Sequence, residues 1–498
     1  MGVGSFILPQ MQTSTNEWQR PVDWLPMPTN ITSTDQIFVG LHAVIENSDN
    51  YCAFSFTTSA GQYQVDWGDG NVTLHNSGTI AQYQYNYATV SNSTLSSRGY
   101  KQVLIKVTPV SGNLLGCDFQ RRFVTTPAQN QPYSSRFLDC ILSMPNASSG
   151  QSIIFGGGTI RHSYCEKVDI KTIGGVTNMN NMFQNCYSLQ SVPLFDTQKV
   201  TNMGVMFQYC SSLQSVPLFN TQNVTNMNNM FQNCTSLQSV PLFNTQNVTN
   251  MGGMFQNCSS LQSVPLFNTQ NVTNMGGMFQ NCSSLQSVPL FDTQNVTNMG
   301  GMFQNCSSLQ SVPLFNTQNV TNIGVMLSSC YSLQSVPLFN TQKVTSMFGM
   351  FEYCSSLQSV PLFNTQNVTA MNDMFYSCTS LQSVPLFDTR NVTNMFRMFI
   401  GCSSLNFIPN FNTTSATNFM DFANNCSSLD RCTTVFRNSV SLQNCQLSRD
   451  ALVEIFTNLV DRTSTTSATI NITGNWGASA LTSVDRLIAT NKNWVITG

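Results

Sequence analysis

Apolar residues recur with a fixed period of 24 residues over the middle and later parts of the chain. Cysteine, leucine, valine, phenylalanine and methionine keep the same offsets from unit to unit, with no insertion between Cys186 and Cys426. In the unit that begins at Cys258 the other apolar positions are Leu261, Val264, Leu266, Phe267, Val272, Met275, Met278 and Phe279. Such a period predicts a repeat solenoid, in which these side chains point inward and stack on their copies in neighbouring coils.

Each 24-residue coil contains two candidate strand segments. Leu261 to Phe267 has the spacing of a leucine-rich-repeat strand, but Pro265 lies inside it and cannot donate a hydrogen bond to a neighbouring strand. Residues 271–275 alternate around a β-branched centre without proline, so we expect the more regular parallel sheet there. A short helical turn is predicted at 278–281, and successive coils should lie ~4.8 Å apart.

The solenoid is predicted over residues 176–426, and the sequence before it has a different character. Residues 1–35 are rich in proline and carry Trp18 and Trp24, which suggests an extended arm for assembly with a neighbouring subunit. Residues 36–112 alternate apolar and polar side chains with the period of β-strands. The fold class is therefore predicted as mainly β.

Both ends of the array are expected to be capped, because a bare solenoid end exposes an apolar cross-section. Residues 113–175 are predicted to link the strand-rich region to the array and to cover its first coil. Residues 427–498 are predicted to form an α/β cap, in which Ser448 begins an amphipathic helix over 449–460. The tail is predicted to form a β-α-β unit from segments 468–475, 479–490 and 493–498.

The array resembles a known family. Its pattern M-x-x-M-F-x-x-C-x-S-L-x-S-V-P-x-F-[ND]-T-x-N-V-T, together with the terminal stretches LSRDALVEIFTNL and NWVITG, resembles the BspA-type leucine-rich-repeat surface proteins over roughly residues 165–498. The resemblance implies a surface or adhesion protein of bacteria, protists or phages that binds host matrix components or cell surfaces.

Residues 36–112 resemble a PKD-type immunoglobulin-like sandwich. The resemblance rests on the turn Trp67-Gly68-Asp69-Gly70, on the later aromatic residues Tyr83 and Tyr85, and on the closing segment Gly99 to Val107. It implies a spacer or interaction module without chemistry of its own. A sandwich of this kind ahead of such an array is also similar to structural proteins of marine-type phages.

The composition restricts the possible partners. Only 8% of the residues are charged, against roughly 25% in an average soluble domain, and the formal net charge is −2. The surface must therefore consist of Asn, Gln, Ser and Thr. Nucleic acid is excluded as a partner because no Lys and Arg clusters are present, and no apolar run is long enough to span a membrane. Expected partners are a host's protein or glycan surface, a neighbouring subunit, or further copies in a homo-oligomer.

Cysteine occupies one position of every coil. Two interpretations are open: a stack of disulfides or metal ligands, or small buried thiols that fill one slot of the core. We favour the buried thiols. This cysteine row consists of Cys186, Cys210, Cys234, Cys258, Cys282, Cys306, Cys330, Cys354, Cys378, Cys402 and Cys426.

The sequence offers little for catalysis or metal binding. His42, His75 and His162 are isolated, without the spacing of a zinc site. Asp66 and Asp69 are candidates for a Ca²⁺ pair, but such turns more often use their carboxylates for local backbone hydrogen bonds. Acidic residues are nearly absent from the array, so paired carboxylates are not supplied. We therefore expect no enzyme activity, no metal and no cofactor.

An outward row of threonines is the candidate binding surface. It includes Thr201, Thr225, Thr249, Thr273, Thr297, Thr321, Thr345, Thr369 and Thr393, and similar positions at Thr177 and Thr417 extend it. The regular hydroxyls and neighbouring amides suit contact with a glycan or a protein, and a remoter possibility is an ice-binding face. Alternatively, these positions simply hold β-forming residues that keep the surface soluble.

The expected function is therefore that of a non-enzymatic structural and binding protein. Residues 1–21 lack a basic stretch followed by an apolar core, which favours assembly into a virion as a fibre, decoration or filament subunit. The alternative is a secreted or cell-surface bacterial adhesin that binds glycans or matrix proteins. Both alternatives place the protein on a virion or at an extracellular surface.

Overall fold

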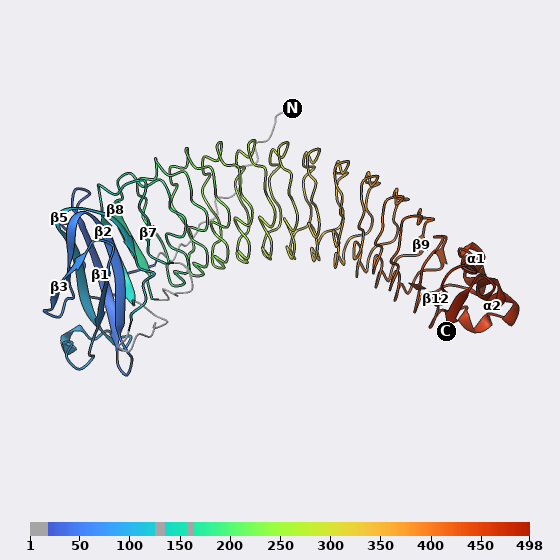
Figure 1. Cartoon of the computed structure of the whole chain (residues 1–498), viewed down its shortest axis with the longest axis horizontal. Coiled ribbons are helices and arrows are strands. Elements are labelled where there is room, and N and C mark those ends of the chain that lie inside the picture. Colours follow the sequence, from blue (N-terminus) through green and yellow to red (C-terminus); the bar gives the residue numbers. More distant parts are fainter. Residues whose placement is uncertain (1–17, 125–134, 157–163) are drawn as a thin grey trace, which may run out of the picture.

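The computed structural model describes residues 18–124, 135–156 and 164–498. A β-sheet domain lies at one end, a curved array of thin coils follows, and two helices close the far end (Figure 1). One continuous apolar core runs from Phe38 in the sheet domain to Trp494 near the C-terminus. The fold is mainly β, and the solenoid expected from the 24-residue period is confirmed.

The sheet domain is built on an eight-stranded sheet with the main order β3-β2-β5-β1-β6-β8, while β4 pairs with β2 and β7 with β5. A 3-10 turn at Asn92–Thr94 precedes β5. The strands are β1 (Ile37–Ile45), β2 (Tyr51–Asp66), β3 (Val72–Asn76), β4 (Ile80–Gln84), β5 (Tyr100–Asp118), β6 (Phe137–Ser143), β7 (Ile153–Ile154) and β8 (Lys167–Thr172).

The long pair β2 and β5 bends in the middle. Its register shifts between Thr57 and Tyr63, where Gly61 has a positive φ of 70°. The bend brings the two halves over one core, because the ring of Phe54 lies 5.6 Å from that of Trp67, which follows the far end of β2. The expected domain boundary at residue 112 falls inside β5. The PKD-type sandwich itself stays a prediction.

The segment expected to link the sheet to the array belongs largely to the sheet. Strand β6 pairs with β1, β7 with the end of β5, and β8 runs parallel to β6. The ring of Phe155, just after β7, stacks between Phe119 and Phe183. The sheet domain is therefore the cap on the first coil, because its core continues into the array.

The described part of the expected N-terminal arm packs against its own domain. Trp24 is buried, and its indole nitrogen donates to the hydroxyl of Tyr100 at 2.9 Å. The indole nitrogen of Trp18 donates to Glu166 at 3.0 Å. Trp24 is thus an intramolecular anchor and has no free face for a neighbouring subunit, contrary to its expected role. Residues 1–17 lie outside the described residues, so an assembly role for them stays a prediction.

Successive coils are joined by backbone hydrogen bonds around one parallel bridge per coil. The bridges form a continuous series from Asn178 to Asn418. The amide of Thr273 donates to Thr249 of the coil before, and the amide of Met275 donates to Asn298 of the coil after. The pairing occurs in the segment expected for the sheet, but it is an isolated bridge and not a continuous strand.

The expected helical turn at 278–281 does not form. The backbone of Gly277 and Asn281 has a φ of about 60°, which interrupts a right-handed helix. The amides of Gly277, Phe279 and Asn281 instead donate to carbonyls of the next coil. Those of Met278 and Gln280 close local turns to the residue three positions earlier. Alternate backbone amides of this segment therefore bond to the next coil and to local turns.

The interior of the array is a stack of identical side chains. The rings of Phe255, Phe279 and Phe303 follow one another at 5.7 Å with nearly parallel planes. Leu266, however, was expected inside and is 59% exposed. The amide of Phe267 donates to the carbonyl of Pro265, so a tight turn centred on Leu266 directs that side chain outward while Phe267 points inward.

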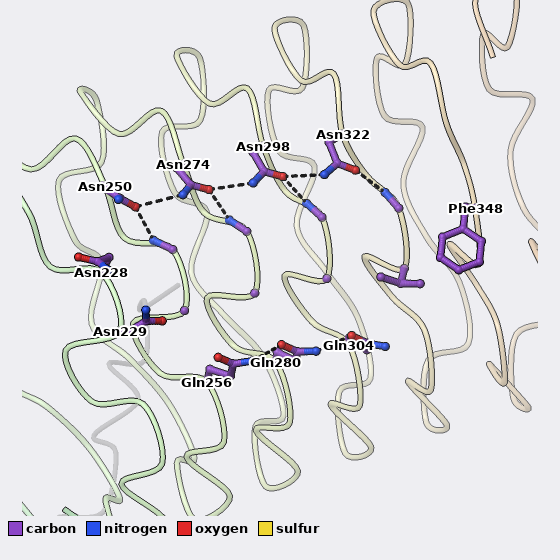
Figure 2. Close-up of a pocket in the computed structure, with 18 residues that line it drawn as sticks. Asn228, Asn229, Asn250, Gln256, Asn274, Gln280, Asn298, Gln304, Asn322 and Phe348 are labelled. Carbon is purple, nitrogen blue, oxygen red and sulfur yellow. Dashed lines mark hydrogen bonds between the residues drawn. The ribbon is translucent and has the colours of Figure 1, made fainter. Parts of the chain in front are cut away.

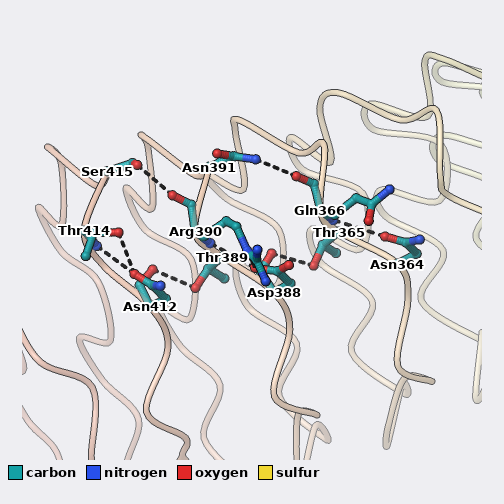
Figure 3. A network of polar contacts seen from close by, with 10 residues as sticks. All are labelled: Asn364, Thr365, Gln366, Asp388, Thr389, Arg390, Asn391, Asn412, Thr414 and Ser415. Atoms are coloured by element: carbon teal, nitrogen blue, oxygen red, sulfur yellow. Dashed lines mark hydrogen bonds and ion pairs between the residues drawn. The ribbon is translucent and has the colours of Figure 1, made fainter.

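Buried threonines form a second set of ties between coils. The hydroxyl of Thr365 donates to the carbonyl of Asp388 at 2.7 Å, and Thr389 donates to Asn412 at 2.8 Å (Figure 3). Asn391 and Ser415 reach back to carbonyls of the preceding coil in the same region. The threonines themselves are buried, so carbonyls of the next coil satisfy hydroxyl groups that water does not reach.

The C-terminal cap follows the predicted plan. The short strands β9 (Phe407–Ile408) and β10 (Arg431–Cys432) pair in parallel, and β11 (Val440–Ser441) joins β12 (Ala468–Asn471) and β13 (Trp494–Thr497). Helix α1 (Arg449–Asn458) begins after Ser448, whose hydroxyl accepts the amide of Ala451. Helix α2 (Ser483–Thr490) follows a 3-10 turn at Ala478–Ala480 and completes the β-α-β unit. The cap closes the apolar core at Trp494.

Candidate binding site: an amide-lined groove across successive coils

A groove of about 620 Å³ crosses the most regular coils of the array. Its residues come from equivalent positions of successive coils, so the groove repeats the same chemistry along its length (Figure 2). The lining residues are Asn228, Asn229, Asn250, Gly252, Gly253, Gln256, Asn274, Gly276, Gly277, Gln280, Asn298, Gly300, Gly301, Gln304, Asn322, Gly324, Val325 and Phe348.

Glycine pairs form the floor of the groove. Gly252-Gly253, Gly276-Gly277 and Gly300-Gly301 occupy the same place in three consecutive coils. A Cβ at Gly276 would approach the amide nitrogen of Asn298 to 2.6 Å, whereas a Cβ at Gly277 would meet only ordinary contacts. The second glycine has a positive φ, which glycine adopts without strain. The missing side chains create the hollow.

Asparagines form one wall of the groove. The side-chain amide of Asn274 donates to the side-chain oxygen of Asn250 at 3.1 Å. Its own oxygen accepts from Asn298 at 3.0 Å and from the backbone amide of Gly276 at 3.0 Å. These bonds use both lone pairs of the oxygen but only one of the two N–H groups. We call Asn250, Asn274, Asn298 and Asn322 the asparagine row; Asn274 and Asn298 each keep one free donor.

Glutamines form the opposite wall. The amide of Gln256 donates to the side-chain oxygen of Gln280, and the amide of Gln280 donates to that of Gln304. We call these three residues the glutamine row. Gln280 keeps one free N–H and one free lone pair after these bonds. Because the rows are tied from coil to coil, their remaining donors and acceptors are held in fixed directions.

The groove is closed at both ends by larger side chains. Asn228 and Asn229 occupy the positions of the glycine pair in the coil before Gly252. Val325 and Phe348 stand at the other end, where the ring of Phe348 is 41% exposed. None of the lining side chains is charged. The groove therefore offers neutral hydrogen bonding along its walls and one aromatic surface at its end.

The threonine row lies on the surface, as expected. Its members are exposed, but several of their hydroxyl groups form hydrogen bonds to the preceding coil. The hydroxyl of Thr273 donates to the carbonyl of Thr249 at 3.2 Å, and Thr297 donates to Thr273 at the same distance. The row therefore joins coils, which reduces what it can offer to a ligand. A binding role for it stays a prediction.

The cysteine row is buried, and all 17 cysteines of the chain are free thiols. The thiol of Cys258 donates to the carbonyl of Phe231 at 3.0 Å, and the other members from Cys210 onward make the same contact. Burial raises the pKa of Cys306 to about 12. The thiols therefore stay protonated as hydrogen-bond donors, which agrees with the favoured interpretation.

Groups considered for metal binding have other partners. Asp66 accepts the backbone amide of Gly68, while Asp69 accepts from Asn71 and Tyr83. Within residues 18–124, 135–156 and 164–498, no three His, Cys, Asp or Glu side chains are grouped to hold a metal ion. His42 is buried among aromatic rings, His75 contacts Thr73, and His162 lies outside the described residues.

The outward leucines are a surface feature that the sequence analysis missed. Each is between 58% and 64% exposed, and they recur once per coil. The only sequence signal was the proline before each of them, which favours a turn. We call these residues the leucine row: Leu194, Leu218, Leu242, Leu266, Leu290, Leu314, Leu338, Leu362 and Leu386.

Among the described residues, no helix is long and apolar enough to cross a membrane.

The chain is similar to a leucine-rich repeat protein from Eubacterium ventriosum, with 16% identity over 74% of this chain and 92% of that chain and a TM-score of 0.34. It is also similar to the functional domain of InlJ from Listeria monocytogenes, with 10% identity over 66% of this chain and 70% of that chain and a TM-score of 0.22.

A third solved structure is the TLR13 chain of a complex with ssRNA13, with 14% identity, coverage of 67% of this chain and a TM-score of 0.23. This chain spans about half of that TLR13 chain, 54%. No match is found among curated proteins.

The array also matches a family model. Residues 161–264, 254–362 and 331–436 each match the family described as Mycoplasma protein of unknown function, DUF285. The three matches overlap and together cover more than half of the chain. The protein therefore belongs to the DUF285 family, and its BspA-like leucine-rich-repeat character is confirmed at this level.

Proposed function

We propose that the protein is a non-enzymatic surface protein of a virion or a cell, and that its array holds a partner's surface through uncharged hydrogen bonds. The observation that carries this proposal is the groove of glycines, asparagines and glutamines, which repeats one set of neutral donors and acceptors over several coils. A repeated surface suits contact with a repeated or extended partner. Catalysis would need a unique group of residues at one place.

The low charge supports the same function. Because only 8% of its residues are charged, the chain has little long-range field with which to attract an ion or a nucleic acid. Specificity must then come from short-range hydrogen bonds and shape. The expected partner is the glycan or protein surface of a host.

Printed panels of neutral glycans and of matrix proteins test this function directly. The full chain should be retained on some spots without releasing any product from them. A chain that lacks residues 258–281 has a shorter groove and should be retained more weakly on the same spots. Product release, or no retention on any spot by the full chain, would contradict the proposal.

A second candidate role is assembly with further copies, and the leucine row favours it. Nine leucines in line form an apolar stripe on a polar surface, and long exposed stripes of this kind mark interaction sites. Only a partner with the same spacing can meet every leucine, and a second copy has that spacing. The nearly uncharged surface also puts little repulsion between copies.

The mass of the protein in solution tests this second role. Light scattering should give a dimer or a larger species for the full chain. Changing Leu242, Leu266, Leu290 and Leu314 to Ser should give a monomer with an unchanged melting temperature. The matched control changes four exposed threonines of the threonine row to Ser. A monomeric full chain would rule out assembly through the leucine row.

A further inference from the structure

The shape of the groove favours an extended chain as its ligand. The floor is open over three successive glycine pairs, and the walls run in the direction in which the coils succeed one another (Figure 2). A compact ligand would meet only one or two coils. A chain that lies along the array would meet the same pair of walls at every coil.

The free hydrogen-bonding groups match hydroxyls. Asn274 and Asn298 each offer one N–H, while Gln280 offers one N–H and one lone pair. A hydroxyl both donates and accepts, so it can satisfy either kind of group. Carboxylates, phosphates and sulfates would find no cation, because no lining residue is charged. The ligand is therefore neutral and rich in hydroxyls.

The spacing of the coils separates a sugar chain from a peptide. At the groove the coils pair through the parallel bridges between Asn250, Asn274 and Asn298, which sets their backbones ~4.8 Å apart there, whereas an extended peptide advances by roughly 3.3 Å per residue. Side chains on one face of an extended peptide recur only every roughly 6.6 Å, so a peptide along the groove would not place equivalent groups at successive coils. An extended chain of β-1,4-linked pyranoses advances by close to one coil per sugar, so each sugar meets an equivalent pair of amides. Phe348, partly exposed at one end, offers a ring on which the face of a terminal sugar can rest.

We propose that the groove binds one linear, neutral, β-1,4-linked polysaccharide chain along the array axis, with one sugar for each glycine-floored coil. This inference rests on the proposed function and identifies its ligand and its site. The asparagine and glutamine rows hold the sugar hydroxyls from both sides. The glycine pairs leave room for the rings, and Asn228, Asn229 and Phe348 mark the two ends.

The chain itself supplies the variants for a test. Asn228-Asn229 stands where other coils have Gly-Gly, and Asn229 adopts a φ of 52°. The double change Gly276→Asn with Gly277→Asn therefore copies a pair that the fold already accepts. It fills the middle of the groove and displaces the side-chain amide of Asn298, which lies 2.6 Å from the place of a Cβ at Gly276. The reverse change, Asn228→Gly with Asn229→Gly, opens the groove by one more coil. Gly401→Asn is the matched control, since it also adds Asn at a positive φ and lies outside the groove.

Titration calorimetry of the full chain with cellohexaose, chitohexaose and xylohexaose measures the binding. We expect at least one hexasaccharide to bind, with its affinity lowered tenfold or more by the Gly276 and Gly277 changes. The Asn228 and Asn229 changes should raise the affinity several-fold, and Gly401→Asn should leave it unchanged. Thermal melting of each variant checks that the array is folded.

The outcomes distinguish this inference from the function on which it rests. If a hexasaccharide binds equally well to the folded variant with the filled groove, the groove is not the site. If no hexasaccharide binds but the full chain is retained on matrix-protein spots, the inference is wrong and the surface-binding function stands. If nothing is retained on any panel, both are wrong.

Discussion

Phe155 of the sheet domain stacks on Phe183 of the array with ring centroids 5.5 Å apart and planes only 12° from parallel. Phe119 stacks on the other side of Phe155, and Phe207 continues the column into the next coil. The sheet domain and the array therefore share one column of rings. A cap that continues the core in this way protects the first coil better than a loosely attached domain, because no apolar surface is left between them.

The ring column should contribute strongly to stability. Phe279 is fully buried between Phe255 and Phe303, so Phe279→Ala should leave a cavity and cost about 3–5 kcal/mol. Leu327 occupies the same offset in a later coil, where it is also fully buried. Phe279→Leu should therefore cost clearly less. Urea unfolding followed by circular dichroism measures both, and equal losses would contradict the role of the ring column.

Buried and exposed threonines should respond differently to the same change. The hydroxyl of Thr269 is buried and donates to the carbonyl of Asp292 at 2.7 Å, so Thr269→Val should cost about 1 kcal/mol by removing this hydrogen bond between coils. Thr273 is exposed, and water can replace its hydroxyl. Thr273→Val should cost less than about 0.5 kcal/mol. The midpoints of urea unfolding of the two variants measure the difference. A larger loss of stability for Thr273→Val than for Thr269→Val would contradict the greater contribution of the buried threonine.

The thiols should be unreactive in the folded protein. Burial raises the pKa of Cys306 and Cys354 to about 12, and all 17 cysteines are buried. Because the thiolate is the reactive form, a thiol reagent at pH 8 should modify less than one cysteine per native chain. In denaturant it should modify all of them. Rapid reaction of several thiols in the native state would show that the array opens.

His42 should make the sheet domain sensitive to acid. Burial and the nearby Arg136 lower the pKa of His42 from 6.5 to about 3. Between these values the unfolded chain binds a proton that the folded chain does not, so the stability is complete above pH 6.5 and declines as the pH falls toward 3. The slope from this group is at most about 1.4 kcal/mol per pH unit. Tryptophan fluorescence during urea unfolding at several pH values measures it.

A His42→Leu variant supplies the control for that measurement. It removes the titrating ring but keeps an apolar side chain in the core. Its stability should depend less on pH between 6.5 and 3 than that of the original chain. An unchanged pH dependence would mean that other groups cause the loss of stability in acid.

Removal of one whole coil should leave a folded, shorter array. Deletion of residues 258–281 joins Asn257 to Cys282 and restores the same sequence pattern across the junction. Each coil contacts mainly its two neighbours, so the remaining coils can stack as before. Deletion of residues 258–269, half a coil, is the control and should cause aggregation. Small-angle scattering and melting curves distinguish the two, and aggregation of the whole-coil deletion would contradict independent stacking.

Much of the fold follows from local sequence rules. The 24-residue period alone predicts the solenoid, since one apolar set per unit can be buried only by stacking. The helix that begins after Ser448 and the β-α-β end follow from capping and periodicity. The burial of Trp24 did not follow from local sequence rules. Its position in a proline-rich segment favoured an extended arm, but a large apolar ring close in space to Tyr100 is buried wherever the fold permits.

The sequence by itself determined the repeat, the buried cysteine row and the uncharged character of the surface. Tertiary structure decided which residues of a coil share a face. The turn between Pro265 and Phe267 directs Leu266 outward, although its apolar nature predicted burial. The groove arises only when three glycine pairs lie next to one another in space between two rows of amides. These features depend on backbone direction and on neighbours 24 residues away, which a pattern of apolar and polar letters does not encode.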